Sequence, residues 1–138
     1  MKLNRKLCMV HVLIQTESHY PVSRKKIRDT VVAMLNGKVR RSAEVSVNVV
    51  GDRQMRRLNK TYRQLDATTD VLSFSQNEST SPMPFVTVPD GVLRLGDVVV
   101  SYPQAVAHAA KNNKFVDDVI TELVVHGLNH LLGIHHPE

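Results

Sequence analysis

The sequence has a single cysteine, Cys8, no tryptophan, and an aromatic content of only 4%. One thiol excludes an intrachain disulfide framework, so we expect the chain to work in a reducing compartment, by default the cytoplasm. The scarcity of aromatic rings argues against ligand binding by extensive base stacking. Apolar runs stay well below the roughly 18 residues that a membrane span requires, so no membrane-spanning segment is expected.

The remaining composition is that of one globular domain. With 138 residues, of which 42% are hydrophobic, the chain is long enough for one substantial core and too short for two independent domains. Basic residues outnumber acidic ones by 18 to 13, and the net charge of +5 favours an anionic partner, either nucleic acid or a membrane surface. Residues 52–63 alone contain five cations and one anion, so most of the net charge lies in one short segment.

Hydrophobic periodicity predicts four strands and four helices. Short apolar or alternating runs predict strands over residues 9–15, 43–50, 70–74 and 93–101. Apolar residues spaced three and four apart predict helices over residues 24–36, 53–63, 102–113 and 115–132. The segment 75–90, which is rich in serine and proline, is expected to be a mobile loop or lid. This order predicts a mixed α/β architecture, a small sheet with helices packed on it.

Individual residues mark several element ends. Ser23 is placed to cap the first helix, and Gly37 to follow its end. Asp52 is expected to cap the second helix in the same way, and Gly96 to form a bulge in the last strand. The alternation in AEVSVNVV, residues 43–50, predicts a half-buried strand with its valines in the core.

The most informative residues are histidines near the end of the sequence, in HGLNHLLGIHH from residue 126 to residue 136. His126 and His130 lie on one helix face, which an apolar stripe centred on Leu123 predicts to be the core-facing one. Gly133 is expected to end the helix in a left-handed conformation, so that His136 folds back toward the pair. Three converging imidazoles form a tripod for zinc and leave a fourth position open, as catalytic sites do.

The same histidine spacing occurs in the metzincin proteases, whose signature is H-E-x-x-H-x-x-G-x-x-H. Their glutamate is the general base, and the corresponding residue here is Gly127, which cannot accept a proton. Glu122, the nearest carboxylate along the helix, could orient His126 or could be a solvated surface residue. The alternative to a metal site is that the histidines are ordinary core, capping or surface residues.

Three segments together resemble the YbeY family of bacterial endoribonucleases and rRNA maturation factors. Residues 126–136 are similar to the family signature H-G-x-L-H-L-x-G-Y-D-H, residues 59–74 to N-x-x-[FY]-R-x-x-D-x-x-T-D-V-L-S-F, and residues 95–101 to L-G-D-I-V-I-S. The chain departs from the first signature at Asn129 and at His135, and the second change makes His135 a competitor of His136 for the third ligand position. The sequence also ends two residues after His136, where family members usually continue.

The resemblance implies that residues 1–138 form a single α+β domain distantly akin to the zinc proteases. It implies a zinc-dependent endoribonuclease directed at single-stranded RNA, acting in 16S rRNA 3′-end maturation and ribosome quality control, with the small ribosomal subunit as a partner. The family's metal ligands correspond to His126, His130 and His136, which would hold one Zn2+ or another divalent transition metal. Its functional arginine corresponds to Arg63.

The positively charged helix suggests how RNA would be held. Its outer face carries a basic ridge of four residues, Arg53, Arg56, Arg57 and Lys60. The ridge suits a phosphate backbone, with a solvated helix face as the alternative. Arg63, at the apolar boundary of that helix, is placed to clamp a scissile phosphate, and a salt bridge to Asp66 or Asp70 is its structural alternative. Attack by a metal-activated water and attack by the RNA 2′-hydroxyl both remain open.

Two other functions fit the same residues. One is a non-catalytic ribosome-assembly factor that binds RNA through the ridge and holds a structural metal. The other is a metal-dependent hydrolase of another substrate, such as a peptidase, although Gly127 removes the usual base.

Overall fold

The computed structural model describes residues 9–17, 19–39, 42–75 and 92–135. Four strands and four helices follow one another in the order β1 (Val10–Thr16), α1 (Arg24–Asn36), β2 (Ala43–Val50), α2 (Asp52–Arg63), β3 (Val71–Ser75), β4 (Leu93–Ser101), α3 (Tyr102–Asn112) and α4 (Val116–His135). The eight predicted elements and the α+β class are confirmed. The predicted loop or lid lies, apart from its first residue, outside the described residues.

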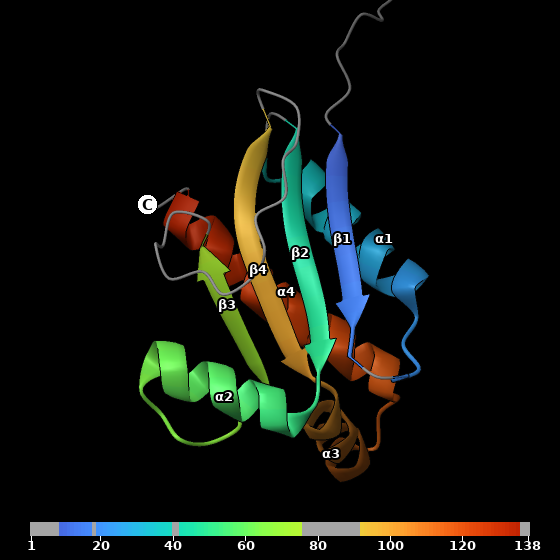
Figure 1. Cartoon of the computed structure of the whole chain (residues 1–138). Coiled ribbons are helices and arrows are strands. Elements are labelled where there is room, and N and C mark those ends of the chain that lie inside the picture. Colours follow the sequence, from blue (N-terminus) through green and yellow to red (C-terminus); the bar gives the residue numbers. More distant parts are fainter. Residues whose placement is uncertain (1–8, 18, 40–41, 76–91, 136–138) are drawn as a thin grey trace, which may run out of the picture.

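The sheet contains the four strands in the order β1-β2-β4-β3 (Figure 1). Strands β1, β2 and β4 run parallel, whereas β3 pairs antiparallel with β4 at one edge. Between β2 and β4 the register shifts, because Glu44 pairs with Arg94 while Val45 pairs with Gly96, leaving Leu95 as the extra residue. Gly96 has a φ of 139°, which only glycine adopts readily, so the predicted bulge is confirmed.

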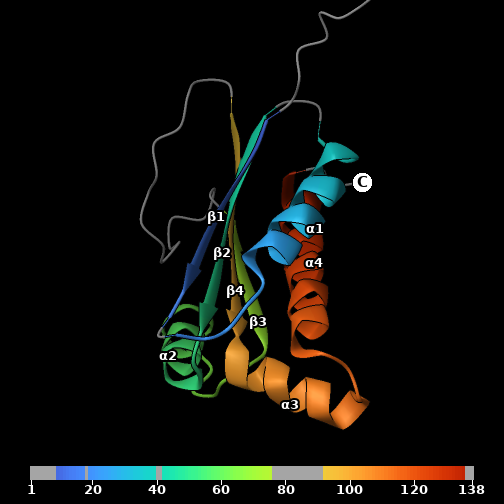
Figure 2. The ribbon, with the colours of Figure 1, turned by 90° about the vertical axis from the view of Figure 1, so that its right-hand side faces the viewer.

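Helices α1 and α4 cover one face of the sheet, and α2 lies against the other (Figure 2). The larger core cluster fills the space between the sheet and α1 and α4, with Val45, Val47 and Val98 at its centre. A smaller cluster that includes Met55 and Phe74 joins α2 to the opposite face. None of the helices in the described part of the chain combines the length and apolarity that crossing a bilayer needs.

Strand β2 is buried along both faces, so the prediction of a half-buried strand is wrong. It lies between β1 and β4, and its polar residues Glu44 and Asn48 are only 7% and 6% exposed. The alternation of apolar and polar residues correctly identified the side chains of β2 that face α1 and α4. The polar residues on the other face are buried as well, because β2 is a central strand. Burial raises the pKa of the Glu44 carboxyl, although the nearby charges of Arg94 and His11 oppose that rise.

Helix α1 begins as predicted, but α2 does not. Ser23 accepts a hydrogen bond from the backbone nitrogen of Lys26 at 3.1 Å, which confirms it as the cap of α1. Gly51, not Asp52, is the N-cap residue of α2, and Asp52 is already helical. A Cβ atom on Gly51 would lie 2.7 Å from the Tyr20 hydroxyl, so close packing leaves no room there for a capping side chain.

Asp52 instead ties three parts of the fold together. Its carboxylate accepts hydrogen bonds from Ser101 at 2.8 Å, from Thr68 at 2.9 Å and from Gln104 at 3.3 Å. Burial opposes ionisation of Asp52, but these three hydrogen bonds outweigh burial and lower the pKa of the carboxyl below its ordinary value. The start of α2 is therefore fastened to the end of β4 and to α3.

Helix α4 runs through Gly133 to His135, so the prediction that Gly133 ends the helix is wrong. Among the described glycines, Gly96 has positive φ and Gly133 does not. Glycine permits a left-handed turn without enforcing one, and here Leu131 and Leu132, both buried, hold the last turns against the core.

Candidate active site

The end of α2, strand β3 and the second half of α4 meet at Ser73. The Ser73 hydroxyl lies 2.5 Å from Nδ1 of His130 on α4. The Ser73 carbonyl accepts a hydrogen bond at 3.0 Å from Nη2 of Arg63, the last residue of α2. One buried residue of β3 thus contacts both the arginine and a histidine that the sequence singles out.

The guanidinium of Arg63 is held in place from several sides. Nη1 donates to the carbonyl of Tyr62 at 3.1 Å, and the guanidinium carbon lies 4.7 Å from the centre of the Phe74 ring. This stacking over a fully buried ring fixes the plane of the guanidinium while the side chain stays half-buried. Asp66, one of the two carboxylates considered as an alternative partner of Arg63, forms an ion pair with Arg56 at 2.7 Å.

His126 and His130 are both exposed, so the prediction that they lie on the core-facing stripe is wrong. Among the described side chains of α4, the fully buried ones are Ile120, Val124, Leu128 and Leu131. At 100° per residue, they centre the core-facing stripe roughly 95° away from Leu123, which places His130 outside the stripe and His126 nearly opposite it. The two imidazoles remain on one face of α4, where they are open to a ligand or a metal ion.

The described histidines have the chemistry that a metal site requires. Because Nδ1 of His130 is engaged by Ser73, Nε2 is left as the coordinating nitrogen, which is how a metal-binding histidine is usually oriented. His126 supplies a second imidazole from the same face. His136 and the side chain of His135 lie outside the described residues, within which no cluster of three metal-binding side chains occurs. The third ligand therefore stays a prediction.

Gly127 has a packing role that the sequence did not reveal. A Cβ atom at this position would lie 2.7 Å from Cγ1 and 3.1 Å from Cγ2 of Val98, a fully buried residue of β4. The absence of a side chain therefore lets α4 approach the sheet closely. A carboxylate at residue 127, where the metzincins have their base, has no space in this fold.

Glu122 does not contact His126. Its carboxylate forms an ion pair with Lys114, with Nζ–Oε distances of 3.0 and 3.2 Å. Glu122 therefore does not orient His126. It is a surface residue, which was the alternative interpretation.

The four residues of the basic ridge are all exposed on α2. Arg56 is paired with Asp66, whose pKa is lowered by the hydrogen bond and the charge of that arginine. Arg57 donates from Nη1 to the side-chain oxygen of Gln54 at 2.6 Å. Arg53 and Lys60 complete the ridge on α2, the helix whose last residue is Arg63.

Ser73 is the site residue that sequence reasoning missed. In the segment DVLSF, Leu72 and Phe74 are the apolar residues, and Ser73 alternates with them. Strand alternation alone therefore places the serine on the face opposite Phe74. Only the packing of α4 against that face identifies the hydroxyl as a neighbour of His130.

The fold and this site define a class of α+β proteins in which a helix with paired histidines packs against a four-stranded sheet. The solution structure of a Thermotoga maritima protein has the same fold, with a TM-score of 0.57 and 22% sequence identity over 88% of this chain and 72% of that one. The chain belongs to the YbeY family: the family described as Endoribonuclease YbeY matches residues 13–138.

Curated relatives in several bacteria carry the description Endoribonuclease YbeY. A protein of Dehalococcoides mccartyi is 41% identical over 102 residues, which cover 70% of this chain and 64% of the relative. A protein of Roseiflexus castenholzii is 43% identical over 93 residues, covering 67% and 57% of the two chains. One from Anaeromyxobacter is 36% identical over 126 residues, covering 89% and 61%. The chain thus spans about three fifths of the length of these relatives.

Proposed function

We propose that this protein is a zinc-dependent endoribonuclease that cleaves single-stranded RNA, and that it acts in 16S rRNA 3′-end maturation and ribosome quality control. The observation that carries the proposal is the position of Ser73, which contacts both His130 and Arg63. A candidate metal ligand and a candidate phosphate ligand thereby contact the same residue, one through its hydroxyl and the other through its backbone carbonyl. Membership of the YbeY family supports the same activity.

His126 and His130 would hold the zinc ion, with His136 as the proposed third ligand. Bound zinc would supply Lewis-acid chemistry, which polarises a phosphoryl oxygen or activates a water molecule. Ser73 orients His130 by engaging Nδ1, so that Nε2 faces the metal position.

Arg63 binds the scissile phosphate and stabilises the negative charge that develops on it. Its guanidinium is already oriented by the Ser73 carbonyl and the Phe74 ring, so little further ordering is needed when the phosphate arrives. Because Gly127 offers no base, the nucleophile is either a water molecule or the RNA 2′-hydroxyl. Analysis of the product ends distinguishes the two routes, since a 2′,3′-cyclic phosphate forms only when the 2′-hydroxyl attacks.

The basic ridge would bind the phosphates of the RNA strand next to the one that Arg63 binds. Backbone neutralisation needs no sequence recognition, which suits a substrate held within rRNA of the small ribosomal subunit. The cytoplasm is the compartment in which such a substrate would be met, and no membrane partner is proposed.

The decisive experiment measures zinc content and cleavage of a single-stranded RNA, with and without a chelator. We expect His126→Ala to lose zinc and to cleave at least about 100-fold more slowly. His19→Ala, which removes an exposed histidine outside the site, is the matched control and should keep both properties.

The same variant separates the rival functions. If His126→Ala binds RNA and still restores rRNA processing in a deletion strain, the protein is a non-catalytic assembly factor. If the zinc-loaded protein degrades casein and leaves RNA intact, it is a hydrolase of another substrate.

A further inference from the structure

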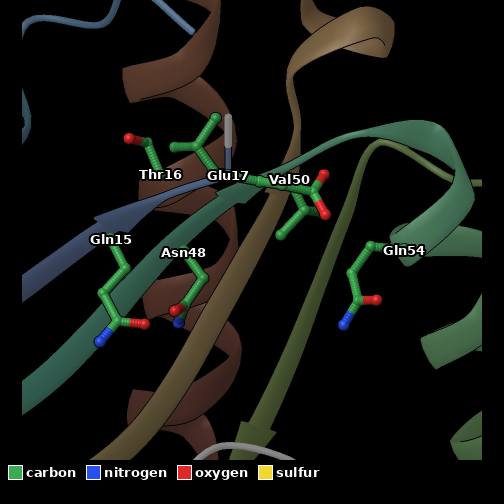
Figure 3. A pocket seen from close by; sticks show the side chains of 7 residues that line it. Gln15, Thr16, Glu17, Asn48, Val50 and Gln54 are labelled. Carbon is green, nitrogen blue, oxygen red and sulfur yellow. The ribbon is translucent and has the colours of Figure 1, made fainter. Parts of the chain in front are cut away.

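A pocket lined mainly by residues with polar side chains lies at the carboxyl ends of β1 and β2 (Figure 3). Its residue from α2, Gln54, is in the first turn of that helix, at the opposite end from Arg63. The pocket has a volume of about 210 Å³, which is smaller than the roughly 300–1,000 Å³ of pockets that enclose drug-sized ligands. A single ring system is therefore the size of ligand that it fits. Its lining comes from the two strand ends and the first turn of α2: Gln15, Thr16, Glu17, Asn48, Val49, Val50 and Gln54.

Three of the residues that line this pocket, Gln15, Asn48 and Gln54, carry carboxamides. Gln15 and Asn48 are direct partners in the register of β1 and β2, so their side chains lie next to each other on the same face of the sheet. Gln54 lines the pocket from α2 and lies to one side of the other two in Figure 3. Carboxamides offer a donor and an acceptor in one plane, which is the pattern found on the edges of nucleobases.

Two of the carboxamides are fixed in orientation by neighbours outside the pocket. Asn48, which is 94% buried, donates from Nδ2 to the Ser46 hydroxyl at 2.7 Å, which leaves Oδ1 as an acceptor. Gln54 accepts at Oε1 from Arg57 at 2.6 Å, which leaves Nε2 as a donor. The pocket thus presents a fixed acceptor and a fixed donor, while the exposed Gln15 adapts to what is bound.

The charges around the pocket favour a base over a phosphate. Among the described residues that line it there is no lysine or arginine, and the Glu17 carboxylate, which accepts from the backbone nitrogen of Gly51 at 2.5 Å, repels an anion. Val50 provides an apolar surface for a ring. The cations lie just outside, on the basic ridge, where they would bind the phosphates on either side of the base.

We infer that this pocket binds one unpaired nucleobase of the RNA strand whose scissile phosphate reaches Arg63. The inference rests on the proposed function. Between Gln54 and Arg63, α2 rises roughly 14 Å at 1.5 Å per residue. That length corresponds to about four nucleotides of a stacked strand at roughly 3.4 Å each. The pocket therefore reads a base within about four nucleotides of the cleavage site, and so determines sequence preference there.

The test uses the zinc-loaded protein and a set of single-stranded RNAs in which one abasic residue is moved through every position. Binding and cleavage are measured for the wild type, for Gln54→Met and for Gln15→Met. Both substitutions keep the length of the side chain and remove its hydrogen bonds. Asn112→Ala, which removes an exposed carboxamide of α3, is the matched control.

We expect one abasic position, within about four nucleotides of the cleavage site, to weaken wild-type binding by about tenfold. In Gln54→Met and Gln15→Met that loss should shrink to about twofold or less, while Asn112→Ala behaves as the wild type. Equal urea midpoints establish that the variants are folded.

A wild-type protein that cleaves RNA but is insensitive to the abasic position overturns the inference and leaves the proposed function standing. An unchanged abasic profile in both variants also overturns it. Failure of the wild type to bind RNA at all overturns the inference and the proposed function together.

Discussion

Replacing Gly127 by alanine tests whether close packing of α4 on β4 is what the glycine provides. The added Cβ would lie 2.7 Å from Cγ1 of Val98, about 0.7 Å short of an ordinary contact at 3.4 Å. Val98 is fully buried in a packed core and cannot swing away, so α4 or β4 must shift. Overpacking of this kind costs about 1–3 kcal/mol of unfolding free energy.

Gly133, in the same helix, supplies the matched control. A Cβ atom there meets nothing within 4 Å, so Gly133→Ala changes only the helix propensity, which should add up to about 1 kcal/mol of stability. The propensity gain is common to both substitutions and cancels in their comparison. Gly127→Ala should therefore be less stable than Gly133→Ala by about 1–3 kcal/mol, measured by urea unfolding followed by circular dichroism.

A double-mutant cycle with Val98→Ala identifies the clash as the cause. Removing the valine methyl groups leaves space for the new Cβ, so the two substitutions together should cost less than their sum, with a coupling of about 1 kcal/mol or more. Equal stabilities of Gly127→Ala and Gly133→Ala would refute the packing argument. So would strict additivity with Val98→Ala.

Three further measurements examine the site and its support. Ser73→Ala should weaken zinc binding by about tenfold in a chelator competition, because Nδ1 of His130 loses its partner, and an unchanged affinity would contradict the orienting role. Asp52→Asn should cost about 2 kcal/mol near neutral pH, because hydrogen bonds to a charged carboxylate are lost. The lowered pKa of Asp52 means that its contribution is present above its ordinary value of 3.8 and disappears as pH falls through the folded-state value, so the two proteins should converge in acid unfolding. Arg53→Ala and Lys60→Ala should each reduce the salt dependence of RNA binding by about 0.7 in the logarithmic slope, whereas Lys111→Ala on α3 should not.

Local signals in the sequence were sufficient for the elements themselves. Ser23 marks the start of α1 because its hydroxyl satisfies a backbone nitrogen of the first turn, and Gly96 marks the bulge because no other residue adopts its φ readily. These effects act within a few residues, so they can be recognised without knowledge of the fold.

The arrangement of the elements depends on contacts between distant residues, and there the sequence was less informative. The helical periodicity of α4 is clear, but its buried face is set by how closely Gly127 lets the helix approach Val98. Displacing the stripe by about a quarter of a turn moves His126 from the core to the surface. Gly133 is a second case in which the local signal was insufficient. The packing of its neighbours Leu131 and Leu132 in the core, and not the glycine itself, keeps α4 helical through this residue.

Within the candidate site, the histidine pair and Arg63 could be identified by residue type and spacing, whereas Ser73 could not. A serine in a strand is common, and its importance lies in two contacts made across 57 and 10 residues of sequence. The carboxamide pocket was missed for the same reason, because Gln15, Asn48 and Gln54 line one pocket only after β1 and β2 pair and α2 packs beside their ends.

The two contacts of Ser73 also have a thermodynamic consequence. Arg63 is bonded to its carbonyl and His130 to its hydroxyl, so the phosphate end and the metal end of the proposed site share one residue of β3. Reciprocity then governs the two ligands: whatever factor zinc contributes to RNA affinity through this strand, RNA must contribute to zinc affinity. If zinc raises the affinity for RNA, binding of the substrate therefore helps to retain the metal, and zinc is held most tightly when RNA is in place.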